Sequence, residues 1–154
     1  MSRLDERDQK LSKAMGLKGG FPPFVELLGL NFEPTEDDGI AVSVAMRDDL
    51  TINPGGPLHG GLISAIMDVI GGSVIAWGLK KEIKGLPLED QAKRLSRVST
   101  IDLRIDYLRP GRGKAFTATG SVMRTGRKVA VARMELRNEE ETLIAVGTGT
   151  YSVG

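Results

Sequence analysis

The chain has 154 residues, a net charge of +1 at pH 7, 40% hydrophobic residues and 27% charged residues, which suits one folded domain with one core. The near-neutral charge and the lack of a long basic block argue against nucleic acid or an anionic membrane as the main partner. With no cysteine and one histidine, disulfides, thiolate or His-cluster metal sites and a cysteine nucleophile are excluded. We therefore expect any chemistry to use carboxylates, hydroxyls, backbone amides and His59, without a cofactor or metal.

Residues 1–29 are expected to form an N-terminal helical arm outside the main domain, which spans residues 30–154. The charged start has no apolar segment of the kind found in secretory signals, so a cytoplasmic location is the default expectation. The pattern predicts a short surface helix over residues 2–15 and a second one after Pro22-Pro23. The apolar side chains of the second helix are expected to dock on the core, namely Phe24, Leu27 and Leu28.

Most of the remaining chain alternates between apolar and polar residues, which indicates strands joined by turns. A positive φ is expected at Gly39 in the first of these turns. The polar segment 80–97 is expected to be an exposed excursion, with a helical turn or two over residues 88–95. The spacing of the turns is typical of an antiparallel meander. The predicted strands cover residues 30–35, 40–46, 98–108, 115–124, 128–137 and 142–151.

One predicted strand, 98–108, has two chemically distinct faces. Alternation places its apolar side chains on one face and its polar side chains on the other. The first face holds Ile101, Leu103, Ile105 and Tyr107, and the second holds Thr100, Asp102, Arg104 and Asp106.

The most apolar stretch covers residues 60–78 and contains Asp68 as its only charge. Its 19 residues approach the length of a membrane span, but an aspartate at the bilayer centre costs about 2.5–3.5 kcal/mol. A helix that is apolar on all sides is typical of a buried central helix, and the surrounding strands supply a sheet for it. We therefore predict an α+β fold in which an antiparallel sheet wraps around a long central helix. Because a sheet covers only one side of a helix, we also expect an oligomer.

A particular spacing of residues surrounds this helix. Asn53 lies six residues before His59-Gly60-Gly61, Asp68 lies nine residues after that histidine, and a later strand ends in Tyr107-Leu108-Arg109-Pro110. Over residues 30–153 the chain resembles the hotdog-fold acyl-CoA thioesterases of the PaaI-like type, within the 4-hydroxybenzoyl-CoA thioesterase superfamily. The resemblance implies hydrolysis of an acyl-CoA, or a related acyl thioester, to an acid and a thiol. It also implies a homodimer with sites at the subunit interface, assembled further as a dimer of dimers.

The resemblance assigns roles to single residues. It implies that Asp68 is the catalytic carboxylate, acting as a general base on water or as a nucleophile, and that the Gly60 amide polarises the thioester carbonyl. Helix-start amides lack internal partners and carry partial positive charge, so such an amide can stabilise a carbonyl oxygen that becomes negative. The local alternatives are a tight helix start at Gly60 and a structurally hydrogen-bonded Asp68. The remaining implied site residues are Asn53, His59, Thr100 and the substrate-binding Gly61.

Helix geometry gives a reason for a shared site. If residues 60–68 are helical, Gly60 and Asp68 are separated by ~12 Å along the axis. A general base must lie within about 3 Å of the water that it activates. One chain therefore cannot easily place both groups on one carbonyl, whereas two antiparallel helices in a dimer bring Gly60 of one chain beside Asp68 of the other.

Several assignments keep a second interpretation. His59 is either a hydrogen-bond donor to the thioester or a helix cap, and Asn53 either orients the substrate or is an ordinary turn residue before proline. Basic side chains at strand ends either bind the phosphates of CoA or are solvated: Arg109, Arg112, Arg124, Arg127 and Lys128.

The whole-chain alternative to a hydrolase is a non-catalytic protein that binds or senses acyl-CoA. A hotdog dehydratase fits less well, because its histidine and carboxylate follow a different pattern. We expect the acyl group to meet an apolar pocket whose far end involves Phe24, Leu27, Leu28 or Trp77 and depends on segment 80–97.

Overall fold

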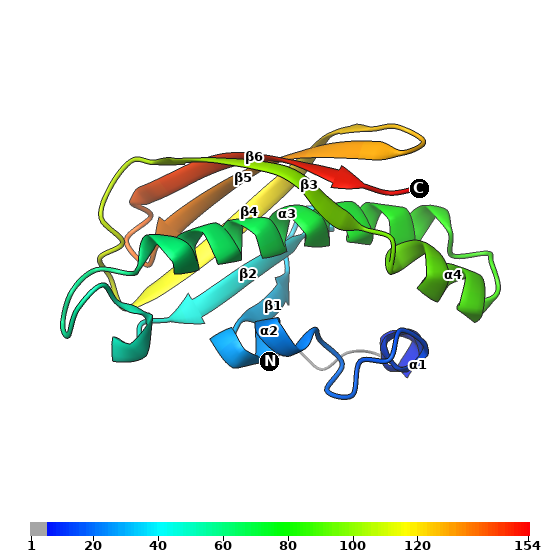
Figure 1. Ribbon diagram of the computed structural model, residues 1–154, viewed down its shortest axis with the longest axis horizontal. Helices are drawn as coiled ribbons and strands as arrows, with labels where there is room; N and C mark the ends of the chain where they lie inside the picture. The colour runs from blue at the N-terminus through cyan, green and yellow to red at the C-terminus, as the bar shows by residue number, and fades with distance from the viewer. Residues whose placement is uncertain (1–5) are drawn as a thin grey trace.

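The structure is a computed structural model that describes residues 6–154, in which six antiparallel strands form one curved sheet around a long helix (Figure 1). The strands lie in the order β1-β2-β4-β5-β6-β3, so β1 and β3 are the two edges. The strands are β1 (Asn31–Pro34), β2 (Ile40–Ala45), β3 (Ser99–Tyr107), β4 (Ala115–Thr125), β5 (Val129–Asn138) and β6 (Leu143–Ser152). The helices are α1 (Glu6–Ala14), α2 (Pro23–Leu28), the 3₁₀ turn η1 (Asp48–Leu50), α3 (Gly60–Glu82) and α4 (Leu88–Leu95).

The central helix α3 crosses the concave face of the sheet and packs against five of its strands, β2 to β6. It ends one turn later than the predicted residue 78, at Glu82. By length and composition alone α3 resembles a membrane span. Its apolar character is explained by the core instead, because Ile66, Met67 and Ile70 are fully buried against the sheet. The predicted α+β arrangement, a sheet wrapped around one central helix, is therefore confirmed.

Two local predictions are wrong. In the β1–β2 turn it is Asp38, at φ 57°, and not Gly39, that adopts the left-handed conformation, which aspartate tolerates better than most residues. In α2 the predicted docking holds for Leu28, which packs against the core, but not for Phe24 and Leu27, which are 53% and 73% exposed. The buried residue of this helix is Val25, 5% exposed. A six-residue helix presents one narrow face to the core, and here that face centres on Val25.

The segment after α3 is more than an exposed excursion. The predicted helical turns over 88–95 form α4, which packs against α1 and the end of α3. The two helices build a second, smaller hydrophobic cluster beside the main core. It consists of Leu11, Ile83, Ala92 and Leu95, with Met15, Ala76 and Leu79 packed against them. Helix α1 begins at Glu6, and the predicted helix start at residue 2 lies outside the described residues.

Candidate active site

Asp68 lies half-buried on α3, where two hydroxyl groups hold one of its carboxylate oxygens. Thr100 Oγ1 donates a hydrogen bond to Oδ1 at 2.7 Å. Tyr151 Oη lies 3.2 Å from Oδ1 and 3.2 Å from the Asp68 carbonyl oxygen, so its proton is shared between them. Within residues 6–154 no hydrogen bond reaches Oδ2. The carboxylate is thus fixed through one oxygen and leaves the other available for chemistry.

Thr100 reaches Asp68 because of an irregularity in β3. The pairing with β6 shifts between Thr100, opposite Tyr151, and Asp102, opposite Thr150. Ile101 is therefore the extra residue of a β-bulge, and it is 58% exposed. The predicted faces were wrong at this point: Thr100 lies on the helix side with Leu103, and Ile101 is displaced from it. Strict alternation cannot anticipate a bulge, which inverts the side-chain order of everything before it.

Tyr151 is the site residue that the sequence analysis missed. Its side chain is 1% exposed and belongs to the main core, where it contacts the helix at Gly71 and Gly72. Burial, with a smaller contribution from the Asp68 carboxylate, raises the pKa of Tyr151, so its phenol stays a proton donor. Its position in an alternating strand indicates an inward-facing side chain, but only the pairing across β3 and β6 shows that it meets Asp68.

The start of α3 is capped by His59. Its Nδ1 accepts a hydrogen bond from the Gly61 amide at 2.9 Å, and its carbonyl accepts from the amides of Leu62 and Ile63. The cap interpretation of His59 is confirmed, and its neutral form must carry the proton on Nε2. The Gly61 amide is consequently engaged within the chain. Of these first helical amides, only that of Gly60 has no acceptor in residues 6–154.

A pocket of about 390 Å³ opens beside Gly60. Tyr107, from the edge strand β3, donates its hydroxyl proton to the Gly60 carbonyl at 3.1 Å and forms one wall. The other lining residues are mostly apolar and come from the loop before α3, from α3 itself and from the segment after β3. They are Ile52, Pro57, Leu58, Ile63, Leu108, Arg109, Pro110 and Gly111.

The remaining candidates are dispersed. Asn53 is exposed and begins a turn, in which the Gly56 amide donates a hydrogen bond to the Asn53 carbonyl at 2.8 Å. Within residues 6–154 the Asn53 side chain makes no hydrogen bond to another candidate residue. The basic residues do not form one cluster. Arg109 and Arg112 lie near the Gly60 end of the sheet, whereas the other three lie exposed at the β4–β5 hairpin: Arg124, Arg127 and Lys128.

Known proteins match this chain in both sequence and overall fold. The model of the thioesterase superfamily matches residues 55–145. The medium/long-chain acyl-CoA thioesterase YigI of Escherichia coli is 44% identical over 133 residues, 86% of each chain. A Shewanella oneidensis crystal structure, described as related to the thioesterase superfamily, is 41% identical with a TM-score of 0.82, and the match covers 99% of this chain and 100% of that one.

A more distant likeness concerns the fold alone. The Escherichia coli PaaI protein from the phenylacetic acid degradation operon is 18% identical with a TM-score of 0.66, over 97% of this chain and 96% of that one. The family match, YigI and the Shewanella oneidensis structure together confirm the predicted hotdog fold and the predicted class of enzyme. The chain belongs to the thioesterase superfamily and is a thioester hydrolase of the hotdog fold.

Proposed function

We propose that the chain hydrolyses medium- to long-chain acyl-CoA to a fatty acid and CoA, with Asp68 as the catalytic carboxylate. Water attacks the thioester carbonyl carbon while Asp68 removes a proton from the attacking water. The carbon–sulfur bond then breaks and the thiolate leaves, taking up a proton to become the CoA thiol. In the other form of the mechanism Asp68 attacks the carbon itself, and water then cleaves the resulting anhydride.

The observation that carries the proposal is the way Asp68 is held. The hydroxyls of Thr100 and Tyr151 fix Oδ1, while Oδ2 has no partner in residues 6–154. Preorganised groups of this kind contribute to catalysis because they need little rearrangement as the reaction proceeds.

The Gly60 amide is the proposed donor to the carbonyl oxygen. His59 satisfies the next three amides of α3, so within residues 6–154 the helix start has one donor without an acceptor, and it lies beside a pocket. Negative charge that develops on the oxygen during attack is stabilised by this amide and by the positive end of the helix dipole. The Nε2–H of His59 is the second proposed donor to the same carbonyl oxygen. Asn53 and Gly61 remain predicted site residues, and no particular contact with the substrate is proposed for them.

We propose that each site is shared by two chains. Gly60 and Asp68 lie on one continuous helix, which separates them by ~12 Å along its axis. Asp68 lies beside β3, an edge strand of the sheet. Apolar surface is exposed along this edge at Ile101, Tyr107 and Leu108. A second copy docked there, with its α3 antiparallel, supplies the missing Gly60. The predicted dimer of dimers would extend this arrangement.

The proposed substrate class rests on sequence similarity. YigI, at 44% identity, is a medium/long-chain acyl-CoA thioesterase by name, and the same class is proposed for this chain. For the phosphates of CoA the two ends of the sheet offer separate basic groups: Arg109 beside the Gly60 pocket, and Arg124, Arg127 and Lys128 at the β4–β5 hairpin.

The test is thiol release from a panel of acyl-CoAs by the wild-type chain and by Asp68→Asn, with Asp37→Asn, an exposed turn residue, as the matched control. Loss of the general base is expected to lower kcat about 10²- to 10⁴-fold, while the control keeps the wild-type rate. Binding without thiol release by the wild type would instead support the non-catalytic acyl-CoA-binding protein. Full activity of Asp68→Asn would reject the proposed mechanism.

A further inference from the structure

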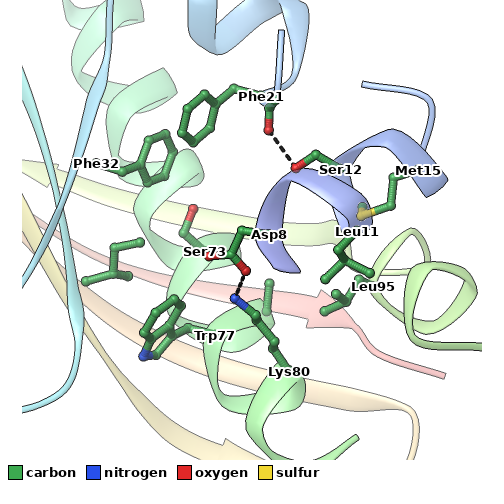
Figure 2. A pocket seen from close by; sticks show the side chains of 13 residues that line it. Asp8, Leu11, Ser12, Met15, Phe21, Phe32, Ser73, Trp77, Lys80 and Leu95 are labelled. Atoms are coloured by element: carbon green, nitrogen blue, oxygen red, sulfur yellow. Dashed lines mark hydrogen bonds and ion pairs between the residues drawn. The ribbon is translucent and has the colours of Figure 1, made fainter. Parts of the chain in front are cut away.

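A cavity of about 220 Å³ lies between the two hydrophobic clusters of the molecule (Figure 2). Phe21, Phe32 and Ile40 wall it on the side of the main core. Leu11, Met15, Ala76 and Leu95, from α1, α3 and α4, wall it on the side of the smaller cluster. The N-terminal arm and segment 80–97 therefore both contribute to this cavity, and neither is needed for the chemistry at Asp68.

The polar side chains around the cavity are mostly satisfied by the protein. Asp8 of α1 pairs with Lys80 of α3, and Ser12 donates to the Gly20 carbonyl at 3.0 Å (Figure 2). What remains toward the interior is largely apolar. Such a cavity favours an apolar occupant over a polar one, because a polar ligand would find few partners for its hydrogen bonds.

The walls are also well fixed. Trp77 donates its indole proton to the Asp38 carbonyl at 3.0 Å, and Lys80 lies over its ring at 5.0 Å from the centroid. Phe21 and Phe32 are stacked with their centroids 5.0 Å apart. The left-handed conformation of Asp38 and the docked arm thus hold aromatic rings around the cavity. Of the residues predicted for the far end of an acyl pocket, Trp77 lines this cavity, while Phe24 and Leu27 do not.

Helix α3 connects the cavity with Asp68. Residues Asp68, Gly72 and Ala76 follow one another at four-residue intervals, so they lie on the same side of the helix. Gly72 carries no side chain and is partly exposed, and the ring of Tyr151 lies beside it, so this ring borders the helix surface between the carboxylate and the cavity. Ala76 lies ~12 Å beyond Asp68 along the axis. In the opposite direction the helix leads to Gly60, which belongs to the second site of a dimer.

We propose that this cavity binds the distal part of the acyl chain, so that the N-terminal arm and α4 set the chain-length preference. The inference rests on the proposed acyl-CoA hydrolysis. An acyl group whose carbonyl is held at Asp68 extends along α3 over Gly72 and enters the cavity at Ser73 and Ala76. Only acyl groups long enough to pass Gly72 gain the contacts with Phe21, Met15 and Trp77, which bury methylene groups and raise kcat/KM.

The test compares kcat/KM for butanoyl-, octanoyl- and dodecanoyl-CoA in three variants. Ala76→Leu fills the cavity and is expected to lower the ratio of dodecanoyl to butanoyl kcat/KM at least tenfold, because each excluded methylene is worth about tenfold or more. Gly78→Leu is the matched control on the same helix, since a Cβ added there meets nothing within 4 Å and Gly78 does not line the cavity, and its ratio should equal that of the wild type. Met15→Ala removes one of the apolar contacts and is expected to lower the ratio as well, by less than Ala76→Leu.

The outcomes separate the inference from the function on which it rests. If the wild type cleaves every substrate but neither Ala76→Leu nor Met15→Ala changes the ratio, the cavity does not bind the acyl chain and the hydrolase proposal stands. If Ala76→Leu does not fold, Met15→Ala alone decides, and an unchanged ratio again overturns the inference. If the wild type releases no thiol from any of the three substrates, the hydrolase proposal itself fails.

Discussion

The two halves of α3 have different surroundings. The first half, Gly60 to Asp68, carries polar groups held by specific hydrogen bonds: the His59 cap, the Tyr107 hydroxyl, and the hydroxyls of Thr100 and Tyr151. The second half, from Ser73 to Glu82, is covered by α1 and α4 and borders an apolar cavity. In the proposed function, one helix carries the chemistry near its start and the selection of chain length near its end.

The two halves differ in which parts of the chain surround them. Strands hold the charge in the first half, and helices outside the sheet cover the second half. Around Asp68 two strands of the sheet, β3 and β6, supply the partners. Beyond Ser73 the partners come from the N-terminal arm and from segment 80–97, which are additions to the six-stranded sheet. Changes in the first half should therefore act on every substrate alike, whereas changes in the second half should act on long acyl chains only.

After the loss of Asp68 itself, the largest expected effect in the first half comes from removing the Gly60 amide. Gly60→Pro deletes the N–H at the first helical position, where proline is tolerated, and the extended His59 backbone suits a following proline. Loss of this donor is expected to lower kcat about 10²- to 10³-fold for short and long substrates. Gly60→Ala retains the amide, and its added carbon lies 3.6 Å from Tyr107, so it should lose far less. Equal losses in the two variants would show that the amide is not the donor.

A smaller effect is expected from the hydroxyls that hold Asp68. Thr100→Val and Tyr151→Phe each remove one donor to Oδ1 with little change in shape. A hydrogen bond to a charged group contributes about 1.5–3 kcal/mol, so each variant should lower kcat roughly tenfold or more. For each variant, steady-state kinetics should show the same loss of kcat on butanoyl-CoA as on dodecanoyl-CoA. A loss confined to the long substrate would place these residues in chain selection instead.

The smallest expected effects are on stability and contrast two glycines of α3. A side chain at Gly71 would lie 2.8 Å from Tyr151 Cζ, in a region without space, so Gly71→Ala should destabilise the fold by about 1–3 kcal/mol. At Gly78 nothing lies within 4 Å, and Gly78→Ala should stabilise the helix by about 0.5–1 kcal/mol. Urea unfolding measures both. Opposite signs are expected, and destabilisation of similar size at both positions would contradict the packing described for the two halves.

Much of the fold could be predicted from local sequence, and the site only partly. The apolar run with one charge predicts α3, and alternation predicts the six strands, because both patterns repeat with the period of the element. The contact between Thr100 and Asp68 could not be predicted, since it depends on the bulge at Ile101. Tyr151 was missed for a related reason, because pairing between β3 and β6 joins residues far apart in the chain. The positions of the basic side chains at strand ends could not be predicted either, because turns that look alike in sequence lie at opposite ends of the sheet.

The most direct test of the central claim, a site built from Gly60 of one chain and Asp68 of another, is complementation between two inactive variants. Asp68→Asn and Gly60→Pro chains are mixed, unfolded and refolded together, and thiol release from octanoyl-CoA is measured against each variant treated alone. Half of randomly formed dimers are mixed, and each mixed dimer contains one intact site of two, so about a quarter of the wild-type rate is predicted. A rate no higher than that of the separate variants, in a sample shown to contain mixed dimers, would contradict the shared site.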